Sequence, residues 1–252
     1  MVNGLQIFQE AFESFSDQYI LIGGTACDLL LDDAGLPFRA TRDLDIVLCI
    51  EALEEDFVRR FWRFVGEGGY VIKEKAQDQA RCLYRFSQPT LSSYPSVLEL
   101  FSRRPELFRD MDLTQIIPVA LEEARVSLSA ILLDDQYYEF ITAQKIEQAG
   151  LSLLSPPGLI ALKAKAWLDL SERKRQGEQI DGADIRKHKN DVFRMFQIVE
   201  PAPLSSIPEQ IRQDMAMFLS SMEAEEVDLK ALGIRIAAKA DILAGLRIIY
   251  CS

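Results

Sequence analysis

The sequence predicts an α+β protein in which a mixed β-sheet with flanking helices is followed by an all-helical C-terminal region. Two observations lead to this fold class. Helical and strand-like segments alternate near the N-terminus and then give way to several strand-like runs, as expected for a mixed sheet. Beyond Gln148, hydrophobic residues recur at helical spacing almost to the C-terminus. We therefore expect two domains, residues 1–148 with the sheet and residues 149–252 with the helices.

The first segments predict the order helix, strand, helix, strand. Apolar residues from Leu5 to Phe15 are spaced as on one face of a helix. A short β-rich run then stops at Gly23-Gly24, and we expect the next helix to be capped by Thr25. These four elements are expected at residues 5–15, 19–22, 25–31 and 44–50.

Further strands are expected after an amphipathic helix at residues 53–65, which Gly66, Gly68 and Gly69 should end. The runs that follow are rich in strand-forming residues and bounded by turn residues. They predict strands at residues 70–73, 81–86, 97–101, 125–133 and 137–141, with a turn at Asp134-Asp135 between the last two.

The C-terminal region reads as helical throughout. Pro156-Pro157-Gly158 opens its first helix, and a polar loop separates that helix from the next. Helices are expected at residues 159–173, 184–199, 206–223, 226–232 and 234–246.

The composition excludes several classes of protein. The 252 residues are 48% hydrophobic, enough for one or two domains with cores of their own. A net charge of -11 argues against a broad basic surface for duplex DNA. No apolar stretch reaches the ~18 residues of a membrane span, and acids within the apolar pattern of the N-terminus lead us to expect no signal peptide there. Four cysteines without CxxC spacing predict reduced thiols and a cytoplasmic protein.

Two short motifs point to phosphate and metal chemistry. Gly23-Gly24 sits where a strand meets the start of a helix, so backbone N–H groups can approach a phosphate. Asp43 and Asp45 lie two residues apart at the start of a strand, on the same face and about 6.5–7 Å apart at the backbone. Two carboxylates at this separation can bind Mg²⁺. The ordered combination is more specific than either motif alone, because two charges beside an apolar strand are costly without a ligand.

Glu99 is a candidate third carboxylate. It is the single acid at the centre of the strand-like run Val97–Phe101. If that strand pairs with the one that carries Asp43 and Asp45, the three acids form one cluster. The alternative is a glutamate on an edge strand that faces water.

These motifs resemble a known family. The segments GGTA and TRDLD are similar to the minimal nucleotidyltransferases of the polymerase-beta-like superfamily, and more closely to the AbiEii/AbiGii-type toxin nucleotidyltransferases. That family follows its core with a lysine-bearing helix and an aspartate near the start of a later helix, and Lys163 and Asp191 fit these positions. The resemblance is closest over residues 17–50 and extends to residues 155–196. Two departures are Gly-Thr in place of Gly-Ser in the turn and the absence of an early arginine after the lysine.

The resemblance implies a nucleotidyltransferase fold whose helical domain completes the active-site cleft. It implies transfer of a nucleotide from a nucleoside triphosphate to a hydroxyl of RNA, such as a tRNA end, or of a protein, in a toxin that an antitoxin opposes. Asp191 or Glu99 would accept the proton of the attacking hydroxyl. The residues implied for nucleotide binding are Gly23, Gly24, Thr25, Thr41 and Lys163. Those implied for catalysis are Asp43, Asp45, Glu99, Lys163 and Asp191, the first three as ligands of Mg²⁺ or, alternatively, Mn²⁺.

Two lysines compete for the phosphate-binding role. Lys163 and Lys165 are two residues apart on a helix and so point in different directions. Lys163 shares a face with Leu159 and Trp167, which favours it as the lysine on the buried side. A lysine that only covers apolar surface is the alternative. The basic run Arg186–Lys189 could attract RNA or triphosphate, or could be a solvated helix start.

Two other functions remain open. The protein could bind nucleotide or metal without turnover, or it could modify a small molecule such as an aminoglycoside. The first would gain support if Glu99 and Asp191 both pointed away from the two aspartates.

Overall fold

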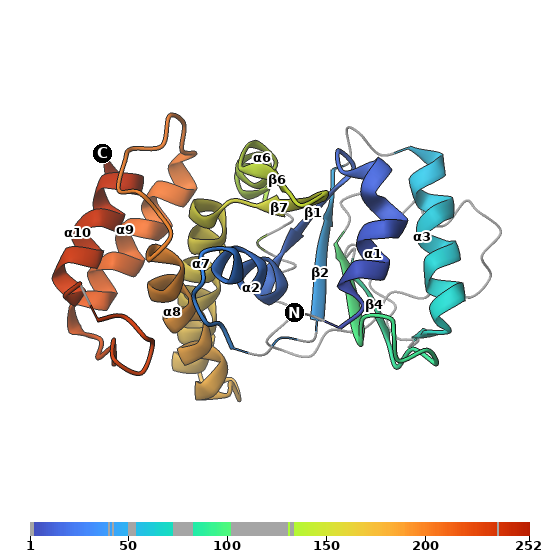
Figure 1. The fold of residues 1–252 in the computed structure, drawn as a ribbon. Coiled ribbons are helices and arrows are strands. Elements are labelled where there is room, and N and C mark those ends of the chain that lie inside the picture. Colours follow the sequence, from blue (N-terminus) through green and yellow to red (C-terminus); the bar gives the residue numbers. More distant parts are fainter. Residues whose placement is uncertain are drawn as a thin grey trace. The chain divides into compact units, whose positions relative to one another are not determined.

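The computed structural model describes residues 3–39, 41, 43–49, 54–72, 83–101, 131, 134–235 and 237–252 (Figure 1). The chain forms two compact units. The first, the sheet unit, consists of Met1–Leu29, Arg39–Leu121 and Lys145–Leu154. The second, the helical unit, consists of Leu30–Phe38, Glu122–Gln144 and Ser155–Ser252. A mixed sheet with flanking helices confirms the predicted α+β fold class.

The sheet unit is built on seven strands in the order β3-β4-β5-β2-β1-β7-β6. Strand β2 pairs parallel with β5, β1 pairs parallel with β7, and all other pairs are antiparallel. Strand β1 is buried at every position because it lies inside the sheet. The strands are β1 Tyr19–Ile22, β2 Asp43–Leu48, β3 Val71–Ile72, β4 Leu83–Ser87, β5 Val97–Phe101, β6 Lys145–Gln148 and β7 Leu151–Leu154.

An aromatic core joins the helices of this unit to its sheet. Helices α1 (Leu5–Phe12) and α3 (Glu55–Gly68) lie side by side, with the short helix η1 (Glu13–Phe15) after α1 (Figure 1). Phe8 packs edge-on against Phe64 of α3 and Tyr19 of β1, with ring centroids 5.9 and 5.4 Å away. These rings explain the helical spacing of the apolar residues in both segments.

The helical unit contains five of the described helices: α6 Asp135–Ala143, α7 Pro156–Arg175, α8 Gly182–Phe196, α9 Glu209–Ala224 and α10 Lys239–Cys251. Ser155 is the N-cap of α7, since its hydroxyl accepts a hydrogen bond from the N–H of Gly158 at 3.3 Å. Trp167 of α7 packs edge-on against Phe218 of α9 with centroids 5.5 Å apart. Helices α9 and α10 lie side by side (Figure 1).

The strand predicted at residues 137–141 is wrong, because this segment belongs to helix α6. Tyr and Phe residues favour strands by propensity, but tertiary packing decides here. Tyr137, Tyr138 and Ile141 are buried at helical spacing. Asp134, predicted as a turn residue, is the N-cap of α6 and accepts from the N–H of Tyr137 at 3.1 Å. A short acidic side chain is common both in turns and at helix N-caps, so Asp134 alone could not distinguish a turn from the start of a helix.

Other predicted boundaries also differ. The helix predicted at residues 226–232 is wrong, since that segment forms turns, and α10 begins only at Lys239. Strands β6 and β7 were not predicted. They form a hairpin whose two-residue loop, Ala149 and Gly150, has positive φ at both positions. The strand predicted at residues 125–133 lies outside the described residues apart from Ile131.

Within the described part of the chain, no helix combines the length and the hydrophobicity that a membrane crossing requires.

Candidate active site

Strand β2 presents both predicted aspartates on one face. Leu44 and Ile46 are buried while Asp43 and Asp45 are half-buried, so the two carboxylates share the face opposite the apolar side chains. Antiparallel pairing with β1 aligns Asp45 with Ile22, the last residue before the Gly23-Gly24 turn. Register alone therefore brings the turn and the Asp43–Asp45 pair together.

Gly23 makes the closest approach in this region. Its φ of 70° is left-handed, and a Cβ at this position would collide with the carboxylate of Asp45. Only glycine meets both conditions without strain. The backbone of the turn is thus in direct contact with one of the two predicted metal ligands.

The second glycine of the turn is flanked by polar groups. A Cβ added to Gly24 would lie 2.6 Å from Oγ1 of Thr41 and 3.4 Å from Nη2 of Arg39. Thr41 was predicted as a nucleotide-binding residue, and Arg39 was not singled out, although it lies in the same segment. Both side chains therefore border the glycine turn within the sheet unit.

Helix α2 (Gly23–Asp33) begins at the glycines, so the prediction that Thr25 caps it is wrong. Thr25 is fully buried inside the first turn, and its hydroxyl donates to the backbone carbonyl of Asp43 at 2.7 Å. This bond joins the start of α2 to the start of β2. The first backbone N–H groups of a helix have no partner within the helix, so this end of α2 can bind an anion.

Glu99 lies beside the two aspartates. Strand β5 pairs parallel with β2 and places Glu99 opposite Asp45. The alternative of an edge-strand glutamate facing water is wrong, because β5 lies between β2 and β4 and Glu99 is 4% exposed. Burial and the neighbouring Asp45 raise the pKa of Glu99 from 4.5 to about 9, although the nearby Arg85 lowers it. Without a bound cation, this shift favours the protonated form of Glu99.

Arg85 is a site residue that sequence reasoning missed. It lies on β4 directly opposite Glu99, and its Nη1 donates to Oε1 of Glu99 at 3.0 Å. A lone arginine within a strand-like run was a visible signal. Its partner became known only with the register of β4 and β5, which depends on residues far apart in sequence.

The three acids do not form a ready metal cage. Within the ranges that the structure describes, no group of three or more histidine, cysteine or acidic side chains is arranged to hold a metal ion. Mg²⁺ in nucleotide enzymes is commonly bound by one or two carboxylates, with phosphates and water as the other ligands. Asp43 and Asp45, on one face beside the glycine turn, fit that kind of site.

Lys163 and Asp191 form an ion pair inside the helical unit. Nζ of Lys163 in α7 lies 3.1 Å from Oδ2 of Asp191 in α8, and their side chains are 7% and 0% exposed. Arg194 adds a longer contact of 3.5 Å to Asp191. The predicted burial of Lys163 is confirmed. A buried pair of this kind is costly to break from one side, which ties the two residues together.

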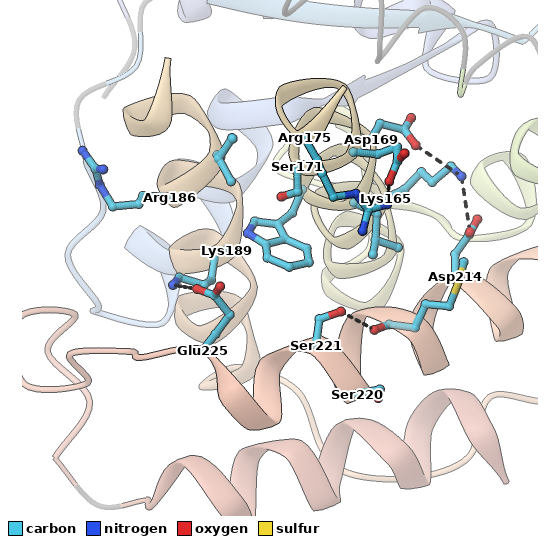
Figure 2. Close-up of a pocket in the computed structure, with 15 residues that line it drawn as sticks. Lys165, Asp169, Ser171, Arg175, Arg186, Lys189, Asp214, Ser220, Ser221 and Glu225 are labelled. Carbon is cyan, nitrogen blue, oxygen red and sulfur yellow. Dashed lines mark hydrogen bonds and ion pairs between the residues drawn. The ribbon is translucent and has the colours of Figure 1, made fainter. Parts of the chain in front are cut away.

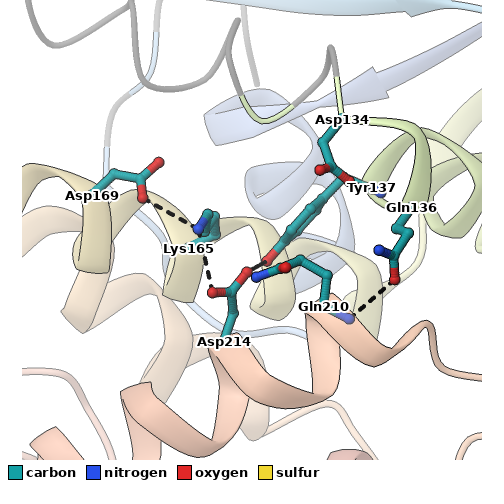
Figure 3. Close-up of polar contacts among 7 residues, drawn as sticks. All are labelled: Asp134, Gln136, Tyr137, Lys165, Asp169, Gln210 and Asp214. Atoms are coloured by element: carbon teal, nitrogen blue, oxygen red, sulfur yellow. Dashed lines mark hydrogen bonds and ion pairs between the residues drawn. The ribbon is translucent and has the colours of Figure 1, made fainter.

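Lys165 has a different environment. It contacts Asp214 of α9 at 3.2 Å and Asp169 at 3.4 Å, while the hydroxyl of Tyr137 donates to Asp214 at 2.9 Å (Figure 3). Asp214 is 1% exposed, so these contacts form a buried polar network that links α6, α7 and α9. Lys165 is therefore bound to acids on two helices.

The same lysine lines a groove of about 750 Å³ within the helical unit (Figure 2). Two members of the basic run, Arg186 and Lys189, also line it. Lys189 pairs with Glu225 at 2.6 Å, and Lys187 pairs with Asp184 at 3.0 Å. The run is thus largely neutralised by neighbouring acids.

Comparison with known proteins identifies the family. A family model described as "Nucleotidyl transferase AbiEii toxin, Type IV TA system" matches residues 6–240. No curated protein matches the chain. The matched range spans most of the sequence and includes the glycine turn, the two aspartates of β2 and the Lys163–Asp191 pair. The chain therefore belongs to the AbiEii family of nucleotidyl transferase toxins.

Proposed function

We propose that this nucleotidyltransferase is Mg²⁺-dependent and transfers a nucleotide from a nucleoside triphosphate to a hydroxyl of an RNA or protein acceptor. One observation carries the proposal. The backbone of Gly23 contacts the carboxylate of Asp45, while Asp43 lies on the same face of β2. Phosphate-binding N–H groups and metal-binding carboxylates are needed side by side for this chemistry.

The sheet unit supplies the nucleotide-binding groups of the proposal. Asp43 and Asp45 would hold Mg²⁺, which offsets negative charge on the phosphates during transfer. The N–H groups at the start of α2 would bind a phosphate, aided by the helix dipole. Thr41 borders this turn, and Thr25 keeps it attached to β2 through its bond to Asp43.

The helical unit supplies two further proposed roles. Lys163 would contact a phosphate as a fixed positive charge, and Asp191 would accept the proton of the attacking hydroxyl. Glu99, which lies opposite Asp45 on the neighbouring strand, is the other candidate for the base. The family description as a type IV toxin supports the further proposal that an antitoxin opposes this activity.

The proposal is tested by transfer of label from each of the four nucleoside triphosphates in the presence of Mg²⁺. Total tRNA, total protein and an aminoglycoside serve in turn as acceptors. The wild type should transfer label to RNA or protein. The double variant Asp43→Asn, Asp45→Asn should transfer none, since two amides cannot replace two metal-binding carboxylates. Asp56→Asn, which changes an exposed acid of α3, is the matched control.

Two outcomes would contradict the proposal. If the wild type binds nucleotide with Mg²⁺ yet labels no acceptor, the protein is a binding module of the same fold. If only the aminoglycoside is labelled, the reaction is drug modification.

A further inference from the structure

One carboxylate of the helical unit lies between two cations from different helices. Oδ2 of Asp191 is 3.1 Å from Nζ of Lys163 in α7, and Oδ1 is 3.5 Å from Nη1 of Arg194 in α8. The side chain of Asp191 is 0% exposed, so its charge is compensated by protein groups rather than by bulk water. Each oxygen of this carboxylate therefore has a positively charged neighbour.

The position of Arg194 is fixed by more than its charge. Arg194 follows Asp191 by three residues in α8, and its guanidinium lies over the ring of Phe38, 5.9 Å from the centroid. Phe38 belongs to the helical unit as well. The side chain of Arg194 is 18% exposed, so it is mostly shielded from water. A guanidinium that stacks on an aromatic ring and contacts a carboxylate is restricted in orientation.

The proposed role of Lys163 calls for a second cation beside Asp191. A lysine that turns from a buried carboxylate to a phosphate leaves a negative charge behind, and an uncompensated buried charge is costly. Arg194 contacts the other oxygen, so the charge of Asp191 stays paired when Lys163 moves. Oδ2, the oxygen that Lys163 leaves, is then the one that can accept a proton.

We propose that Arg194 is a positioning residue that holds Oδ1 of Asp191 and so releases Lys163 from Oδ2 to contact a phosphate of the nucleotide. This inference rests on the proposed function, since it concerns the lysine and the aspartate of the same reaction. In the transfer step, the hydroxyl oxygen bonds to the α-phosphorus, the bond from that phosphorus to the departing pyrophosphate breaks, and the proton goes to Oδ2 of Asp191. Arg194 acts on this step through Asp191.

The test measures binding of the α,β-methylene analogues of the four nucleoside triphosphates, with Mg²⁺, to the full chain by isothermal titration calorimetry. Arg194→Gln should weaken binding by about tenfold, a coupling common within one ion-pair network, because Lys163 then stays with Asp191. Arg194→Lys keeps a cation at this position and should return the affinity to within about threefold of wild type. Arg247→Gln, which removes an exposed arginine of α10, is the matched control for the change of charge.

Two further backgrounds separate this role from a direct contact with the nucleotide. In Lys163→Met, Arg194→Gln should change the affinity much less than in the wild-type chain, because no lysine is left to release. Equal effects in both backgrounds would overturn the inference.

Asp191→Asn gives a second decision. It should bind the analogue at least as tightly as the wild type, since a neutral amide holds Lys163 less firmly than a carboxylate does, and it should lose transfer. A loss of affinity of about tenfold or more in Asp191→Asn would overturn the inference. That result needs no arginine variant, so it decides the matter even if Arg194→Gln fails to fold.

Failure of the proposed function gives a different result. If the wild type binds no analogue, or if Lys163→Met binds it unchanged, the phosphate role of Lys163 is wrong, and the role of Arg194 falls with it. If binding depends on Lys163 while Arg194→Gln has the same effect in both backgrounds, Lys163 keeps its role and only the inference about Arg194 falls.

Discussion

At the residue scale, the site depends on one point where backbone and side chain meet. Gly23 has a left-handed φ and also leaves room for the carboxylate of Asp45. The sequence could suggest that these two motifs lie together, because a glycine turn suits a phosphate and an alternating pair of aspartates suits the metal ion that accompanies it. It could not reveal Arg85, whose partner is set by strand register rather than by any local pattern.

Gly23→Ala should therefore weaken both stability and transfer. A left-handed alanine costs about 1–2 kcal/mol, and the added methyl must also displace Asp45. A misplaced group of this kind can lower the transfer rate by about a hundredfold. Gly35 is a matched control, since it has the same φ of 70° with nothing within 4 Å of an added Cβ. Unfolding in urea and the transfer assay would measure the two effects. Equal behaviour of Gly23→Ala and Gly35→Ala would show that only backbone strain matters.

At the element scale, strong hydrophobic periodicity was readable from the sequence, whereas capping residues and strand propensity misled. Helix α7 was predicted from its proline start and apolar pattern, and its buried Lys163 followed from the face that it shares with Leu159. Residues 137–141 were mistaken for a strand because aromatic residues suit both element types when buried. The hairpin of β6 and β7 was missed because its short strands lack a clear alternation of polar and apolar residues.

Helix α7 offers a matched pair of lysines. Lys163→Met should lower transfer by about a hundredfold or more, as expected when a group that stabilises developing phosphate charge is removed. Lys165→Met should retain transfer, because its partner Asp214 keeps the hydrogen bond from Tyr137. Lys163→Met removes the ion pair with Asp191, and Lys165→Met removes the pairs with Asp214 and Asp169, so urea unfolding measured beside transfer separates activity from folding.

A double variant strengthens the comparison of the two lysines. Lys163→Met leaves Asp191 without its nearest cation, and breaking a buried pair from one side costs about 3–5 kcal/mol. Adding Asp191→Asn removes the stranded charge and should recover stability without recovering transfer. Recovery of transfer together with stability would make the pair a structural feature alone.

At the scale of the whole molecule, the excess of acids over bases makes the protonation of buried carboxyls important. The chain has 39 acidic and 28 basic residues, so each further ionisation adds to its net negative charge. The fold class and the order of the motifs followed from hydrophobic pattern along the whole chain. Which acid would be buried did not, because burial of Glu99 requires β5 to lie between two other strands.

The contribution of Glu99 to stability should accordingly fall as the pH rises. The pKa of Glu99 is raised from 4.5 to about 9 in the folded protein, so between these values the folded state holds a proton that the unfolded state has lost. The free energy of unfolding then decreases with rising pH across this window. Glu99→Gln has no such proton, so its stability relative to wild type should improve steadily from pH 5 to pH 8.

Urea unfolding can follow the sheet unit selectively. The chain has two tryptophans, Trp62 in α3 and Trp167 in α7, so a Trp167→Phe background leaves a reporter in the sheet unit alone. Glu55→Gln, which changes an exposed glutamate of α3, controls for the loss of one acidic side chain. Wild-type and Glu99→Gln curves that run parallel from pH 5 to pH 8 would show that Glu99 is already ionised in the folded protein. In that case Arg85 would balance a full negative charge on Glu99 through their 3.0 Å hydrogen bond.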